Sequence, residues 1–89
     1  MGPDDLLLLA TARRQLEDGT ARRIREAARL RRSEVAAAAN VSVPALQRWE
    51  TGAQSPRGEP ALRYARVLAQ LAQMTGPPGA DGGDGDVAA

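Results

Sequence analysis

The segment around Asn40 constrains the fold more than any other part of the chain, because it predicts two short helices joined by a tight turn. Apolar residues recur at helical spacing over residues 32–39 and again over residues 43–50. Asn40 lies between them, and asparagine tolerates the left-handed backbone that such a turn requires. Ser42 can cap the second helix, and the small Ala36 suits a close helix crossing. The spacing therefore predicts a helix-turn-helix.

Helical patterns extend on both sides of this motif. One covers about residues 3–18, where two aspartates suit the first turn, and it stops at Gly19. Others cover residues 21–30 and about 60–74, and no segment predicts a strand. We expect an all-α fold, a compact bundle of about five helices. We divide the chain into an N-terminal helix over residues 1–19, a helix-turn-helix domain over residues 20–75 and a disordered Gly/Asp/Ala tail over residues 76–89.

The arginines are concentrated in the middle of the chain. Residues 11–75 carry all twelve arginines against six of the eleven acidic residues, which gives this part a net charge of +6 although the whole chain has only +1. A basic folded part with acidic ends attracts an anionic partner more strongly than the net charge suggests.

The composition argues against an enzyme or a metal protein. The chain has no Cys and no His, which excludes a disulfide framework, a thiolate metal site and a nucleophile activated by histidine. We therefore expect no catalytic activity, no cofactor and no metal. The longest apolar run, Leu6–Ala10, is too short to cross a bilayer and follows acidic residues, unlike a signal peptide. We expect a cytoplasmic protein with no membrane partner.

The motif resembles the Cro/repressor-like helix-turn-helix family of the xenobiotic-response-element type. The resemblance covers half of the chain, from Ile24 to Leu68, and its most specific part is the Val-Ser…Trp-Glu-x-Gly pattern between Val41 and Gly52. The other matching segments are Ile24–Ala27, Glu34–Ala36, Asn40, Pro56 and Leu62–Leu68. The resemblance implies a DNA-binding bundle of about five helices, usually a dimer on a near-palindromic operator.

The chain departs from the family pattern at three places. Arg31 and Arg32 stand where the family usually has a Ser or Thr cap followed by a Gln that contacts phosphate, so we expect the loss of a cap that contributes about 1 kcal/mol. Asn40 replaces a glycine that the family often has in the turn. The usual short fifth helix is not evident, which leaves the dimer geometry open.

The resemblance implies a role for the outer residues of the second helix. The expected base-reading residues are Val43, Pro44, Gln47 and Arg48. Arg48 can pair with guanine and Gln47 with adenine, whereas Val43 and Pro44 can touch a thymine methyl group. The alternatives are that Arg48 contacts only phosphate or solvent and that Val43 packs in the turn.

Other residues are expected to hold the DNA backbone. The candidate phosphate contacts are Arg31, Arg32, Ser42, Thr51 and Arg57, with a solvated face as the alternative for the first two. The arginines at positions 22, 23, 25 and 29 fit a solvated helix face. Ile24, Ala36, Leu46 and Trp49 fit the core.

Four consecutive leucines, Leu6, Leu7, Leu8 and Leu9, span more than one helical face, so one monomer does not easily bury them all. We expect them to form a dimer contact or a contact with a partner protein. The function expected is sequence-specific binding of double-stranded DNA by a small homodimeric transcriptional repressor, a type common in bacteria and phages. The alternatives are an antitoxin-like or adaptor module that holds another protein through its N-terminal helix, and a recombination accessory protein that bends DNA.

Overall fold

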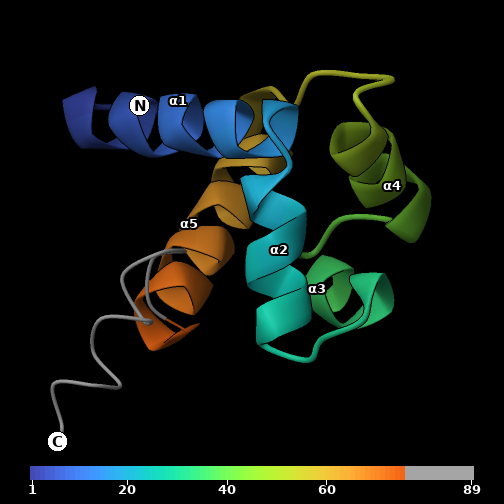
Figure 1. Cartoon of the computed structure of the whole chain (residues 1–89). Coiled ribbons are helices and arrows are strands. Elements are labelled where there is room, and N and C mark those ends of the chain that lie inside the picture. The colour runs from blue at the N-terminus through green and yellow to red at the C-terminus, as the bar shows by residue number, and fades with distance from the viewer. Residues whose placement is uncertain (76–89) are drawn as a thin grey trace, which may run out of the picture.

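A computed structural model describes residues 1–75, which form five α-helices and no strand (Figure 1). The helices are α1 (Pro3–Glu17), α2 (Thr20–Ala27), α3 (Arg32–Ala39), α4 (Val43–Thr51) and α5 (Gly58–Thr75). The predicted all-α bundle of five helices is therefore confirmed. The predicted disorder of residues 76–89 concerns a segment outside the described residues.

The turns between the helices depend on residues in the left-handed region. Gly19 has a φ of 85° and separates α1 from α2, as the sequence predicts. Asn40 has φ 56° and ψ 48°, which confirms the backbone predicted for the turn between α3 and α4. The Val41 N–H then donates to the Ala36 carbonyl at 2.9 Å, so the turn also satisfies a free carbonyl at the end of α3.

The end of α2 differs from the prediction. The helix ends at Ala27 and not at Leu30, because Arg29 adopts a φ of 61° and turns the chain out of the helix. The Leu30 N–H donates to the Arg25 carbonyl at 3.2 Å, which is the pattern that a glycine usually completes. Arg29 thus holds a backbone conformation that is costly for a residue with a Cβ atom.

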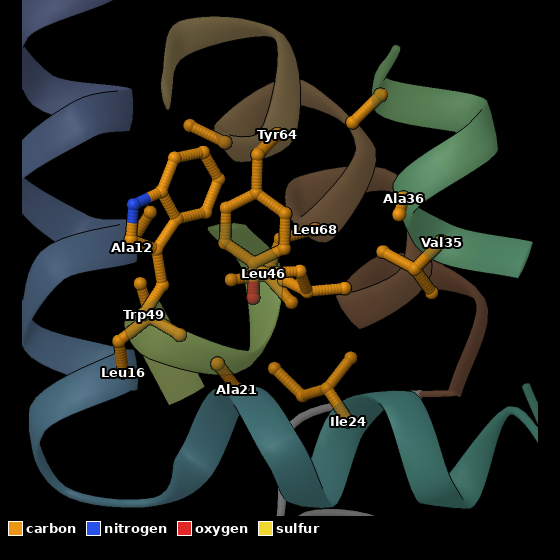
Figure 2. Close-up of a cluster of buried hydrophobic side chains, with 12 residues drawn as sticks. Ala12, Leu16, Ala21, Ile24, Val35, Ala36, Leu46, Trp49, Tyr64 and Leu68 are labelled. Atoms are coloured by element: carbon orange, nitrogen blue, oxygen red, sulfur yellow. The ribbon is translucent and has the colours of Figure 1, made fainter. Parts of the chain in front are cut away.

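The core lies where α5 meets the other helices. Figure 2 shows Leu46 and Trp49 of α4 converging with Tyr64 and Leu68 of α5. The Trp49 and Tyr64 rings are 5.4 Å apart between centroids and tilted by 53°, which is a favourable aromatic arrangement. Many of the remaining core positions are alanines, which lets the helices approach closely; they are Ala12, Ala21, Ala36, Ala39, Ala61 and Ala65. The four residues predicted as core, Ile24, Ala36, Leu46 and Trp49, are all buried.

The N-terminal helix shares this core. Helix α1 packs mainly against α5 and α2, and it contributes Ala12 and Leu16 to the main hydrophobic cluster. The four consecutive leucines of α1 lie on different faces of the helix and differ in burial. Leu9 is only 5% exposed and Leu8 is half-buried against the cluster, whereas Leu6 and Leu7 are exposed. The prediction of a contact made by all four leucines therefore needs correction, because Leu9 belongs to the interior of the monomer.

Candidate nucleic-acid interface

Helix α4 has one buried edge and one open face. Leu46 and Trp49 are buried and attach this helix to the core. The residues predicted to read bases, Val43, Pro44, Gln47 and Arg48, are all exposed and lie together on the other side. The helix therefore presents these side chains to a partner while its position is held by burial.

The start of α4 is capped as predicted. The Ser42 hydroxyl oxygen accepts the Ala45 N–H at 3.1 Å, and Pro44 lies in the first turn, where its missing N–H leaves no donor unpaired. Ser42 is exposed, so its hydroxyl proton remains available to an anion at this helix end. At the other end of α4, the exposed Thr51 hydroxyl donates to the Arg48 carbonyl at 3.3 Å.

Arg48 is connected to the loop that follows α4. Its Nε–H donates to the side-chain oxygen of Gln54 at 3.0 Å, and the Gln54 backbone N–H donates to the Arg48 carbonyl at 3.2 Å. The loop turns back at Gly52, which has a φ of 83°. Sequence reasoning did not identify Gln54, because nothing in the spacing alone places the loop beside Arg48.

The start of α3 carries the two arginines that replace the usual cap and glutamine. Arg31 is exposed, and its side chain makes no capping bond. The Glu34 carboxylate accepts the Arg31 backbone N–H at 2.8 Å and satisfies one donor at the helix start. The predicted loss of the side-chain cap is thus confirmed, although Glu34 compensates for part of it.

A buried charge cluster joins α2, α3 and α4. The side chain of Glu50 is 1% exposed and accepts hydrogen bonds from two arginines. Arg25 donates its Nε–H at 2.7 Å and its Nη2–H at 3.1 Å, and Arg32 donates its Nε–H at 2.8 Å. Arg25 also donates to the Leu30 carbonyl at 2.9 Å. The assignment of Arg25 to a solvated face is therefore wrong, because only 11% of its side chain is exposed.

The two arginines of the cluster stabilise the ionised form of Glu50. Burial alone would raise the pKa of Glu50, but the hydrogen bonds and positive charges of Arg25 and Arg32 outweigh it and hold the pKa below its ordinary value. Glu50 is thus ionised at neutral pH. Arg32 stays one-third exposed, so part of its guanidinium remains available at the surface.

Two further arginines hold the elements that frame α4. Arg63 of α5 donates to the Ala39 carbonyl at 2.9 Å and to the Asn40 carbonyl at 3.0 Å, at the turn between α3 and α4. Arg13 of α1 donates to the Pro56 carbonyl at 2.9 Å, in the loop after α4. Helix ends leave carbonyls that need donors, but the sequence does not reveal which distant arginine supplies them.

The predicted phosphate-binding residues lie at the start of α3, at the two ends of α4 and in the loop before α5. Arg31 and Arg32 begin α3, Ser42 begins α4, Thr51 ends it, and the exposed Arg57 lies just before α5. Figure 1 shows α3 and α4 on one side of the bundle and the N-terminal end of α1 on the other. Residues 1–75 contain no group of side chains arranged to hold a metal ion. None of the helices in that range has the length and apolar character needed to cross a membrane.

Comparison with known proteins agrees with this geometry. The family model described as Helix-turn-helix matches residues 22–71, which include α3, α4 and most of α2 and α5. No curated protein and no solved structure shows significant similarity to the chain. The matched segment is more than half of the chain and contains both helices and the turn around Asn40, so the protein belongs to the Cro/repressor-like helix-turn-helix family, a family of DNA-binding proteins.

Proposed function

We propose that this protein binds double-stranded DNA sequence-specifically and acts as a small dimeric transcriptional repressor. The observation that carries this proposal is the division of α4 into a buried edge, Leu46 and Trp49, and an exposed face that holds Gln47 and Arg48. A helix held in this way can enter the major groove without losing contact with its domain.

The exposed face of α4 carries the chemistry needed to distinguish base pairs. Arg48 has a forked guanidinium that matches the O6 and N7 acceptors of guanine, and the amide of Gln47 matches adenine. Val43 and Pro44 offer apolar atoms to a thymine methyl group. Each two-bond contact of this kind contributes about 1–3 kcal/mol of discrimination against the wrong base.

The residues around α4 would hold the DNA backbone in register. Arg31, Arg57 and the exposed part of Arg32 carry positive charge, and Ser42 and Thr51 offer hydroxyl groups at the two ends of α4. Such contacts position the protein but carry no sequence information. They also make binding weaken as salt concentration rises, because bound phosphates release counterions.

A second copy of the chain is the partner proposed for α1. The exposed Leu7 lines a pocket of about 380 Å³ between α1 and α5, together with Leu8, Ala65 and Ala72. Leu6, which precedes Leu7 on α1, is exposed as well. An exposed apolar patch is typical of an interaction site. A dimer formed there would leave α4 free, and an operator occupied by the dimer would be blocked to polymerase.

Selection of bound sequences from a random duplex pool tests the DNA-binding proposal. We expect an enriched sequence, and we expect two related half-sites if the protein binds as a dimer. Arg48→Ala should then lose the preference at one base pair. The matched control, Arg57→Ala, should weaken binding to all sequences alike and reduce the salt slope by about 1. A pool that shows no enrichment, with equal losses in both variants, would contradict base reading.

The mass of the protein in solution tests the dimer. We expect a dimer by light scattering, and Leu7→Glu should convert it to a monomer because a carboxylate would be buried in an apolar contact. Gln70→Glu adds the same charge at an exposed position of α5 and should leave the mass unchanged. A wild-type monomer that co-purifies with a stoichiometric protein would favour the alternative in which the exposed leucines bind a different partner.

A further inference from the structure

The loop after α4 contacts Arg48 through a single residue at two points. The side-chain oxygen of Gln54 accepts the Arg48 Nε–H at 3.0 Å, and the Gln54 backbone N–H donates to the Arg48 carbonyl at 3.2 Å. Because both bonds join the same two residues, the position of the guanidinium is tied to the backbone of α4 as well as to the loop.

The loop that carries Gln54 is itself held in place. Gly52 turns it back with a φ of 83°, and Pro56 is buried and accepts a hydrogen bond from Arg13 of α1 at 2.9 Å. Gln54 also lines a pocket of about 290 Å³ together with Trp49 and Pro56. The amide is therefore presented to Arg48 from a segment fixed at both ends.

This contact selects which atoms of Arg48 can reach DNA. A guanidinium has five N–H donors in a fixed plane, and Gln54 occupies the one on Nε. The two Nη groups remain, and they can donate to the O6 and N7 acceptors of guanine. A side chain that is already ordered also loses less entropy when it binds.

We propose that Gln54 is a specificity-positioning residue that orients Arg48 for a guanine. This inference rests on the proposed function. It differs from a direct role for Gln54, in which its own amide would bind a base or a phosphate and Arg48 would be unaffected by its loss.

The experiment measures discrimination at the base pair that Arg48 reads, as the ratio of Kd values for duplexes that differ only there. Gln54→Ala should reduce this ratio about 3- to 10-fold, the range expected for ordering one long side chain, while binding to random DNA stays within about 2-fold. Gln54→Glu keeps an acceptor for Arg48, so it should retain the ratio although its charge weakens binding to all DNA. Gln73→Ala, an exposed glutamine on α5, is the matched control.

A double variant separates positioning from direct contact. Gln54→Ala added to Arg48→Ala should cause no further loss of discrimination, because the residue that Gln54 orients is already absent. An unchanged ratio in Gln54→Ala, or a further loss in the double variant, would overturn the inference. If the wild type shows no base preference, the proposed function itself fails. If Arg48→Ala abolishes a preference that Gln54→Ala leaves intact, only the positioning role fails.

Discussion

Glu50→Ala is expected to lower the free energy of unfolding strongly, although it removes only one carboxylate side chain. The carboxylate accepts hydrogen bonds from Arg25 and Arg32 and thereby joins α2, α3 and α4. Without it, the Arg25 guanidinium, which is almost fully buried, keeps its charge but loses its counterion. Arg25 would retain only its bond to the Leu30 carbonyl.

The magnitude follows from the burial of the two arginines. Removing one partner of a buried ion pair costs about 3–5 kcal/mol. We expect the lower end, about 3 kcal/mol, because Arg32 is one-third exposed and can turn its charge into water. A domain of this size has a total stability of roughly 4–11 kcal/mol at the usual value per residue, so the variant should fold but be close to the limit.

Urea unfolding monitored by Trp49 fluorescence and far-UV circular dichroism measures the effect. Glu26→Ala is the matched control, because it breaks the Arg22–Glu26 pair, in which both side chains are more than half exposed. That pair is spaced i,i+4 on a helix surface and should contribute about 0.3–0.5 kcal/mol. If the free energies of unfolding of the two variants agree within experimental error, the buried cluster does not stabilise the fold more than an exposed ion pair does, and the expected value of about 3 kcal/mol is wrong.

Three further predictions concern single residues. The pKa of Glu50 lies below its ordinary value of 4.5, so the contribution of its carboxylate to the free energy of unfolding is present above that pH and is lost as the pH falls through the folded-state pKa. Glu50→Gln should therefore flatten the acid side of a plot of unfolding free energy against pH. An unchanged acid side would contradict this. Arg29→Gly should raise the free energy of unfolding by about 1 kcal/mol, because it relieves the left-handed backbone, and thermal melting checks the sign. Ser42→Ala should lower the free energy of unfolding by about 1 kcal/mol, because it removes the cap on the Ala45 N–H. Ser33 lies inside α3 and does not cap a helix, so Ser33→Ala should not share this loss.

The helices and their turns could be predicted because local signals set them. Gly19, Asn40 and Ser42 each act within a few residues, and the structure places them as the spacing predicts. The end of α2 could not be predicted in the same way. The left-handed position there is held by Arg29, whereas the sequence rule looks for glycine or asparagine.

The contacts that fix the candidate site could not be predicted because they join distant parts of the chain. Arg25 follows a core residue in the sequence. Only the folded arrangement brings Glu50 next to Arg25, and this ion pair offsets the cost of burying the guanidinium. The bonds from Arg63 to the turn and from Arg13 to the loop likewise span long stretches of sequence. The exposed face of α4 is different, since its helical period separates Gln47 and Arg48 from Leu46 and Trp49 without further information.

Because α1 packs against the rest of the bundle, there is a minimum length of chain that can be transferred to another protein as a folded domain. A chimera that contained only residues 22–71 would lack Ala12 and Leu16, and the core around Trp49 would lose part of its apolar packing. It would also lack the arginine that secures the loop at Pro56. The smallest segment that can be transferred with these contacts intact therefore begins upstream of the motif, within α1 and no later than Ala12.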